Sequence, residues 1–504
     1  MGRLRLRTFD GDEGTAHMPQ SIDSMMEMAL LMNVKNCIMN AQNNRNIIGV
    51  VYDALTGSYL LTQPETFVEK SDFMNITTFL ENTSGRQTLR QRLEKYHIPI
   101  TSGRALFSSI LPEDFYYRKG EVLIRDGILV SGVITKDHVG GANGSIIQVL
   151  MKDYDQETTV NFLTDIYNIM REWLDIRGFS VGLDDCFLGG DDPGKTIAKE
   201  VQSAKMLVRS MGWKLKDPLE EERREKQVIA YLNTARDLGA RISDKNLGTY
   251  NAFNVMSKSG AKGSTFNIAQ ITGIVGQQYL QGQRMPQTIS RAEGGRSSVY
   301  HPVDSLDPAG RGFIENSFLT GLSPAEMFFH QAAGREGLTD TAIKTSETGS
   351  MHHRIVKALE DSKVYEDGSV RNAFGVIFDY TYGEDGFNAE MVESVSTKTG
   401  SFASFINIQR LAARTNARYG YSTPGEPKIQ EIVPLRPAIL GPEPVGIAGT
   451  IPGIREQRGQ VYEIGDIVRT ATGTRIVQQV AGERLLIQQQ GLNPEWVKAE
   501  KLEL

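Results

Sequence analysis

The sequence is poor in cysteine and contains no long apolar run. Two cysteines, Cys37 and Cys186, occur among 504 residues, too few for a disulfide framework or a four-cysteine zinc site. No stretch of about 18 apolar residues is present, so no membrane-spanning helix is predicted. The basic start, Met1 to Arg7, leads into an acidic turn instead of the apolar core of a signal peptide. We therefore expect an intracellular protein in a reducing compartment, with no zinc bound to this chain.

An excess of basic charge is also absent. The 55 Lys and Arg residues stand against 61 Asp and Glu, and the net charge of −6 argues against an even basic surface that coats nucleic acid. A large protein with a local basic patch remains compatible with this balance. Because single cores stop growing at about 250–300 residues, the length predicts roughly two to five domains.

Turn signals and apolar periodicity predict mixed secondary structure. Strand-like pieces bounded by Gly and Pro dominate residues 66–135, for example Glu121–Arg125. Three amphipathic helices follow, one ending at Gly178 and two opening at Asp192-Pro193 and Asp217-Pro218. We interpret the charged run Glu220–Lys226 as a solvated face, and the last two helices as a hairpin. The predicted inner faces are Val160, Leu163, Ile166, Met170, Trp173 and Leu174 in the first helix, Ile197, Val201, Ala204 and Leu207 in the second, and Val228, Leu232 and Ala235 in the third.

A long helix is predicted from Ser323. Ser323-Pro324-Ala325-Glu326 is a capping box with Pro at the first helical position, and no Pro follows until beyond Asp361. Some 38 residues, or about 57 Å, would be long for a globular helix. Gly334, Gly337 and Gly349 lie inside it, each costing about 1 kcal/mol relative to Ala. The pattern alone leaves two interpretations open: close backbone packing, or a helix built to bend.

The C-terminal part divides into an arm and a small module. Residues 423–453 are rich in Pro, which predicts a linker. Beyond it, short β-rich pieces alternate with turns over residues 454–504, the pattern of a small SH3-like β-barrel that binds or docks. The predicted strands are Gly465–Arg469, Arg475–Val477, Leu485–Gln488 and Trp496-Val497.

Asp10-Gly11-Asp12-Glu13 places two carboxylates on either side of a glycine that allows a sharp turn. Both could face one hard cation such as Mg²⁺, which prefers oxygen ligands. Acidic turns that contain Asp-Gly are common, so the tetrapeptide by itself does not decide between a metal site and a surface turn.

A series of ordered motifs extends over about 390 residues of the chain. The motifs are Phe9-Asp10-Gly11-Asp12-Glu13, His17-Met18-Pro19-Gln20-Ser21, Asn44-Arg45 with Gly49, Asp53-Ala54-Leu55-Thr56-Gly57, Gly178-Phe179-Ser180-Val181-Gly182-Leu183-Asp184-Asp185, Gly260-Ala261-Lys262-Gly263-Ser264, Asn267-Ile268-Ala269-Gln270, Gly276-Gln277-Gln278, Gly312-Phe313-Ile314-Glu315-Asn316-Ser317-Phe318, Phe328-Phe329-His330, Gly334-Arg335-Glu336-Gly337-Leu338, Asp340-Thr341-Ala342-Ile343-Lys344-Thr345-Ser346-Glu347-Thr348-Gly349 and Tyr382-Gly383-Glu384-Asp385-Gly386-Phe387. Together these motifs resemble the largest subunit of multisubunit DNA-directed RNA polymerases, in the eukaryotic, archaeal and large-DNA-virus style.

The resemblance implies an α+β multidomain fold and a location in the nucleus, cytoplasm, viral factory or virion. It divides the chain into an active-site segment with part of a double-psi β-barrel (1–65), a mixed pore domain (66–185), a helical funnel (186–315), and the bridge helix with a cleft segment (316–422). Expected partners are the second-largest subunit, other polymerase subunits, the remaining pieces of the largest subunit, template DNA, nascent RNA and NTPs. No membrane contact is expected.

The same resemblance implies templated RNA synthesis by two Mg²⁺ ions, the second arriving with the NTP. Asp10 and Asp12 match two of the family's three metal-binding aspartates. Lys262 matches a basic residue near the nucleotide route, although a solvated loop lysine is the alternative. Gln277 and Gln278 would line the funnel or form structural hydrogen bonds. The centre of the bridge helix, Ala342 to Ser346, would abut the template base. This favours a helix that bends and contacts nucleic acid over a helix whose glycines serve close packing alone. Expected nucleic-acid contacts along this helix are Arg335, Thr341, Ala342, Lys344, Thr345, Ser346 and Arg354.

The sequence also departs from the family pattern. Leu6-Arg7-Thr8 stands where the family has Asn-Ala-Asp, so the third metal carboxylate is replaced by Thr8, and no trigger-loop sequence is found. The chain thus resembles a middle slice of the subunit. In one explanation, other chains complete a split catalytic subunit, which Asp10, Asp12, Lys262 and the unbroken long helix favour. In the other, the chain is a non-catalytic assembly or nucleic-acid-binding module. An unrelated Mg²⁺ nuclease would leave the bridge-helix likeness unexplained.

Overall fold

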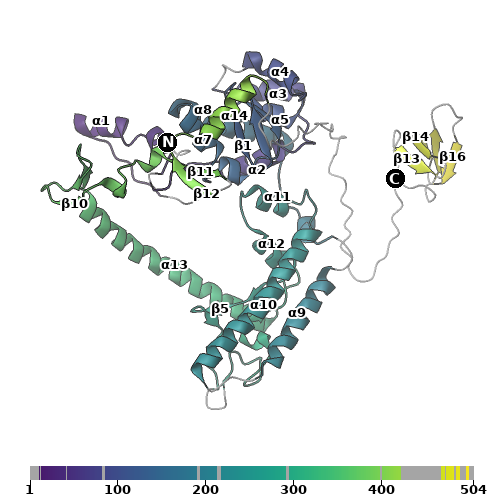
Figure 1. Cartoon of the computed structure of the whole chain (residues 1–504). Coiled ribbons are helices and arrows are strands. Elements are labelled where there is room, and N and C mark those ends of the chain that lie inside the picture. The colour runs from purple at the N-terminus through teal and green to yellow at the C-terminus, as the bar shows by residue number, and fades with distance from the viewer. Residues whose placement is uncertain are drawn as a thin grey trace. The chain divides into compact units, whose positions relative to one another are not determined.

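The computed structural model describes residues 11, 13–40, 42–81, 86–189, 193–212, 217–290, 295–397, 400–421, 467–470, 473–481, 484–488 and 495–498. Helices and small sheets alternate along the chain, which confirms the α+β class. The chain divides into two units, Met1–Ile439 and Leu440–Leu504, and each is described by itself below (Figure 1). Among the described residues, no helix is long and apolar enough to cross a membrane.

The first core of the larger unit is built almost entirely from residues 38–173. Between residues 11 and 65, the described part of the chain forms helices and one isolated bridge, Met39 to Asn46, and contains no strand of the expected barrel. Helix α8 packs against α2 and α7 and ends at Gly178, as predicted. The helices around this core are α1 (Ile22–Leu30), η1 (Val34–Cys37), α2 (Tyr52–Leu61), α3 (Lys70–Thr77), α4 (Arg86–Lys95), α5 (Gly103–Ser108), α6 (Lys136–Val139), α7 (Ile146–Asp153) and α8 (Gln156–Arg177).

A three-stranded antiparallel meander completes the first core. It consists of β1 (Tyr117–Lys119), β2 (Val122–Arg125) and β3 (Ile128–Ser131), and every residue of β2 and β3 is buried. The predicted strand at 121–125 is therefore confirmed. The prediction that strands dominate residues 66–135 is wrong, because three helices, α3 to α5, occupy most of residues 70–108. The apolar positions of α4, Leu89 and Leu93, lie one helical turn apart, a spacing that the strand interpretation overlooked.

The second core lies between two long helices, α9 (Pro193–Ser210) and α10 (Pro218–Asn246), which pack against each other (Figure 1). Asp217 caps α10 and Pro218 occupies its first turn, as predicted. The predicted inner face of α9 is partly wrong, because Leu207 is 48% exposed and Val208 is buried instead. Val208 follows Ala204 by four residues and so remains on the same helical face. The other elements between α8 and α13 are η2 (Leu183–Cys186), α11 (Ala252–Ser259), α12 (Thr265–Thr272), β4 (Gly276–Gln277), β5 (Tyr279–Leu280), β6 (Gln283–Arg284), η4 (Pro308–Arg311) and β7 (Phe313–Ile314).

The longest helix, α13, runs over 36 residues from Pro324 to Leu359, close to the predicted length (Figure 1). Ser323 and Glu326 form the predicted capping box. After it come β8 (Lys363–Val364), β9 (Val370–Arg371), β10 (Ile377–Asp379), η5 (Tyr382–Glu384), η6 (Ala389–Met391), and the hairpin of β11 (Glu393–Thr397) and β12 (Gly400–Ser404). The chain then returns to the first core, where Ala413 and Ala417 of α14 (Ile408–Arg418) pack against Tyr116 and Leu123.

The smaller unit contains a four-stranded antiparallel sheet in the order β13-β14-β15-β16. Its strands are Ile467–Thr470, Gly473–Ala481, Arg484–Gln488 and Glu495–Lys498, so all four predicted strand positions are confirmed. Cross-strand neighbours include Ile467 with Ile476 and Leu485 with Val497. The predicted Pro-rich linker, 423–453, lies outside the described residues.

Candidate catalytic and nucleic-acid interface

The acidic turn is described only at its glycine and its last residue. Asp10 and Asp12 lie outside the described residues, and Gly11 between them is exposed with φ 143°, a value that favours glycine. No group of three or more His, Cys, Asp or Glu side chains gathers in the part of the chain that the structure describes. Two carboxylates around an open glycine suit Mg²⁺, which commonly takes one or two protein carboxylates and fills its octahedron with water and phosphate oxygens.

Lys262 occupies an exposed loop between α11 and α12. Gly260 ends α11 in the left-handed conformation, with φ 79°, which turns the chain into this loop. The Lys262 ammonium lies 5.3 Å from the centre of the Tyr52 ring, at the start of α2. Lys262 is therefore solvent-accessible and held beside an aromatic face.

The two glutamines differ in their surroundings. Gln277 is 6% exposed in β4, and its amide nitrogen donates to the Arg311 and Gln278 carbonyls, at 2.8 and 2.7 Å. Its amide oxygen has no hydrogen-bond partner among the described residues. Gln278 is half-buried and its amide oxygen lies 3.3 Å from Nδ1 of His330, in the second turn of α13. Gln277 thus has the contacts of a structural residue, and Gln278 joins β4 to α13.

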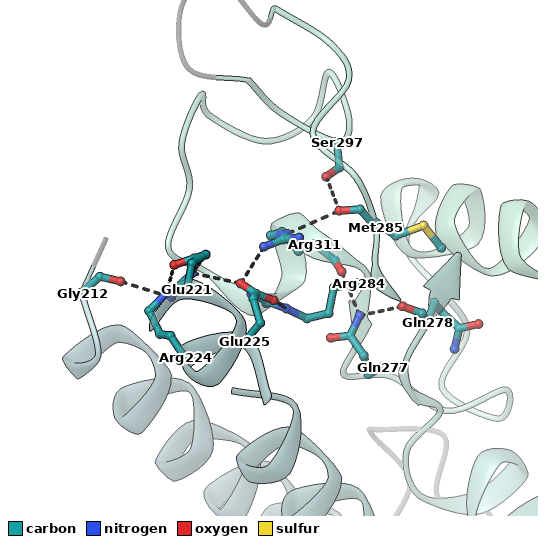
Figure 2. Close-up of polar contacts among 10 residues, drawn as sticks. All are labelled: Gly212, Glu221, Arg224, Glu225, Gln277, Gln278, Arg284, Met285, Ser297 and Arg311. Atoms are coloured by element: carbon teal, nitrogen blue, oxygen red, sulfur yellow. Dashed lines mark hydrogen bonds and ion pairs between the residues drawn. The ribbon is translucent and has the colours of Figure 1, made fainter. Parts of the chain in front are cut away.

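A cluster of ion pairs centred on Glu225 underlies these strands (Figure 2). Its carboxylate accepts hydrogen bonds from Arg284 at 2.8 Å, from Arg311 at 2.8 Å and from Arg224 at 2.9 Å. Burial opposes the ionised carboxylate, but the hydrogen bond from Arg284 and the three positive charges outweigh it and hold the pKa of Glu225 below its ordinary value. The cluster fixes α10 to the β5–β6 hairpin and to η4.

The interpretation of Glu220–Lys226 as a solvated face is therefore wrong for part of the run. Glu222 and Lys226 are exposed, whereas the side chains of Glu221, Arg224 and Glu225 are only 14, 11 and 21% exposed. The missed signal was periodicity, because Glu225 and Glu221 continue the stripe of α10 toward its N-terminus by two more turns. That stripe is Glu221, Glu225, Val228, Leu232 and Ala235.

The first turns of α13 are anchored to the second core. The Glu326 carboxylate accepts from the Ser323 and Glu315 backbone N–H groups, at 2.8 and 2.9 Å, and from the Asn316 side chain at 2.8 Å. Burial raises its pKa, but these hydrogen bonds prevail and keep the pKa below its ordinary value. Further along, Glu336 accepts from the Gln281 backbone N–H at 2.8 and 2.9 Å. These contacts fix the first third of the helix.

Beyond Glu336 the helix is exposed. Every residue from Gly337 to Glu360 is exposed, and among the residues with described positions none approaches within 4 Å of a Cβ added at Gly334, Gly337 or Gly349. Close packing against the described part of the chain therefore does not explain the three glycines. Four threonine hydroxyls donate to the carbonyl four residues earlier, a bond that favours bending of helices. They belong to Thr339, Thr341, Thr345 and Thr348.

The seven predicted contact residues all lie on this helix and all are exposed. Lys344 pairs with Asp340 at 3.0 Å, and because both side chains are exposed, this ion pair contributes little to stability. The structure thus gathers Arg335, Thr341, Ala342, Lys344, Thr345, Ser346 and Arg354 on α13, and connects that helix to Gln278 through His330.

Comparison with known proteins matches three consecutive family models. These are RNA polymerase Rpb1 domain 3 at residues 37–186, domain 4 at residues 214–314 and domain 5 at residues 321–483. A similar curated protein is the probable DNA-directed RNA polymerase II subunit RPB1 homolog of Invertebrate iridescent virus 6, 32% identical over 447 residues. The alignment covers 82% of this chain and 42% of that relative.

Proposed function

Because the chain belongs to the family of largest subunits of DNA-directed RNA polymerases, we propose that it supplies part of the catalytic centre for templated RNA synthesis. In this proposal Asp10 and Asp12 hold Mg²⁺. When bound there, Mg²⁺ would stabilise the attacking and leaving oxygens of nucleotidyl transfer. The chain spans 42% of the length of its viral relative. The partners that we propose are other polymerase subunits, template DNA, nascent RNA and NTPs.

The main support for this proposal is that the two parts of α13 have different surroundings. Its start is fixed by Glu326, Glu336 and His330, whereas the surface after Glu336 is open to solvent and carries basic, small and hydroxyl side chains. Such a surface suits the backbone and bases of a nucleic acid, because small residues permit close approach and cations pair with phosphates. We propose that this helix is the bridge helix, and that residues 66–185 and 186–315 form the pore and funnel regions.

Lys262 would attract the NTP triphosphate, since it is exposed and lies on a glycine-flanked loop. Gln278 would act indirectly by holding the start of α13 through His330. Gln277, with its backbone hydrogen bonds, would support β4.

A non-catalytic module is the second candidate, favoured by Thr8 at the position of the family's third aspartate. The two functions are separated by reconstituting the chain with its partner polypeptides and measuring Mg²⁺-dependent, templated NMP incorporation. The proposal predicts activity that Asp10→Asn or Asp12→Asn reduces by at least 100-fold, on the order of one lost metal-stabilised interaction.

The neighbouring exposed carboxylate provides the control: Glu13→Gln should retain activity. An active complex that is indifferent to both Asp variants would overturn the assignment of the metal site. An inactive complex that still assembles and binds template would favour the module.

A further inference from the structure

We propose that Tyr52 is a positioning residue that holds the Lys262 ammonium for the nucleotide triphosphate. This inference rests on the proposed function of Lys262 and adds a residue to it. Tyr52 carries no phosphate-binding charge of its own, but its ring centre lies 5.3 Å from the Lys262 ammonium nitrogen. The aromatic face attracts the cation through its quadrupole.

The backbone of Tyr52 is fixed in an uncommon conformation. Its φ is +52°, in the left-handed region that bulky residues rarely occupy. The segment that precedes Tyr52 is closely packed: a Cβ added at Gly49 would lie 2.9 Å from the Gly140 backbone, so these two segments are in direct contact. The Tyr167 hydroxyl also accepts from the Val51 N–H at 3.2 Å and donates to the Gly49 carbonyl at 3.3 Å. Strain of this kind persists where the surroundings hold it, and it gathers at functional sites.

The loop that carries Lys262 is fixed from the other side. A Cβ at Gly260 would lie 2.7 Å from the Lys136 Cβ, so the loop packs directly on the start of α6. Ala261 packs against the first core, and its backbone N–H donates to the Met256 carbonyl at 3.1 Å. Both partners of the Tyr52–Lys262 contact therefore lie on segments that pack against the first core.

An aromatic partner suits a phosphate-binding lysine better than a carboxylate does. A carboxylate neutralises the ammonium, as Asp340 does for Lys344, and must be displaced before a phosphate binds. The ring limits the rotamers of a long, flexible side chain while the full positive charge and the N–H donors stay available. Tyr52 would thus lower the entropy cost of ordering the Lys262 side chain when a nucleotide binds. It would not compete with the phosphates for the ammonium group.

The test uses the reconstituted polymerase and measures KM for NTP and kcat separately. Tyr52→Ala should raise KM about two- to five-fold with little change in kcat, the size of an exposed cation–π contact. Tyr52→Phe keeps the ring and should retain the native KM. In a Lys262→Ala background, Tyr52→Ala should have no further effect on KM. Tyr231→Ala, an exposed tyrosine of α10, serves as the matched control and should leave KM unchanged.

The outcomes separate the inference from the function on which it rests. If Lys262→Ala leaves KM unchanged, the assignment of Lys262 to the nucleotide route fails. If Lys262→Ala raises KM but Tyr52→Ala does not, the positioning role of Tyr52 is wrong. The positioning role would also be wrong if Tyr52→Ala raised KM equally in the Lys262→Ala background. The same holds if Tyr52→Ala lowered only kcat and the yield of assembled polymerase, because both results indicate a structural role.

Discussion

Arg410 and Asp153 lie 257 residues apart in the sequence and form a two-hydrogen-bond ion pair, with Nε to Oδ2 at 2.9 Å and Nη2 to Oδ1 at 2.7 Å. Glu393 binds the same guanidinium at 2.7 Å. Burial works against the charge on Arg410, but hydrogen bonds to Asp153 and Glu393 raise the pKa of the guanidinium above its ordinary value. This three-residue cluster holds α14 and β11 to the end of α7, so the segment after α13 returns to the first core.

Removing the guanidinium should release this return segment. Arg410→Ala leaves two poorly solvated carboxylates facing each other, because the side chains of Asp153 and Glu393 are only 18 and 8% exposed. We expect the docking of α14 to lose about 3–5 kcal/mol. Hydrogen exchange of residues 393–418 measures the loss, and Arg418→Ala, at an exposed position of the same helix, is the control. Equal protection in both variants would contradict the structural role of Arg410.

Glu225 should be the most sensitive charged position of α10. Glu225→Gln removes the carboxylate shared by Arg224, Arg284 and Arg311, and should destabilise the second core by about 3 kcal/mol. Glu222→Gln, three residues earlier and paired with Lys226 in solvent, should leave the stability almost unchanged, because solvent screens an exposed ion pair. Hydrogen exchange of the α9 and α10 amides compares the two variants. A similar cost for both would mean that the cluster is as weak as a surface pair.

Acid should weaken the second core and the start of α13. The pKa values of Glu225 and Glu326 are lower in the folded protein than in the unfolded chain, so unfolding takes up protons. Their contribution is complete above the unfolded value, about 4.3, and is lost as pH falls through the lower folded values. Amide exchange at pH 7 and at about pH 3.5, corrected for intrinsic rates, should show this loss. The acid-induced loss of amide protection should be smaller when Glu225 and Glu326 are both changed to Gln.

Replacing a glycine of α13 should stabilise the helix but impair its function. Gly337→Ala meets no neighbour within 4 Å in the described structure, so the helix of the free chain should gain about 1 kcal/mol. If the helix bends against nucleic acid, the same change should slow nucleotide addition by the reconstituted polymerase. Val356→Ala, also exposed in α13 but seven residues beyond Gly349, raises helix propensity away from the glycines and serves as the control. Unchanged elongation by Gly337→Ala would argue against a functional bend there.

Local rules sufficed for several elements of the fold. The caps at Asp217 and Ser323, the stop at Gly178 and the buried face of Val228, Leu232 and Ala235 follow from hydrogen-bonding needs and helical period within one segment. The ordered motifs likewise indicated the polymerase family, because a series of short signatures depends on sequence alone. Leu207 was misplaced by one residue, an error that a 100° rotation per residue makes easy.

The sequence by itself determined the family, the α+β class, the long helix with its capping box and the strand positions of the smaller unit. Only the tertiary structure decided which charges are buried, since Glu225 finds its arginines 59 and 86 residues away, and Asp153 finds Arg410 after 257. It also decided that Tyr52 lies beside Lys262 and that the glycines of α13 have open surroundings. Helical period and caps act within a few residues, whereas the partner of a charge or of an aromatic ring is set by how distant segments pack.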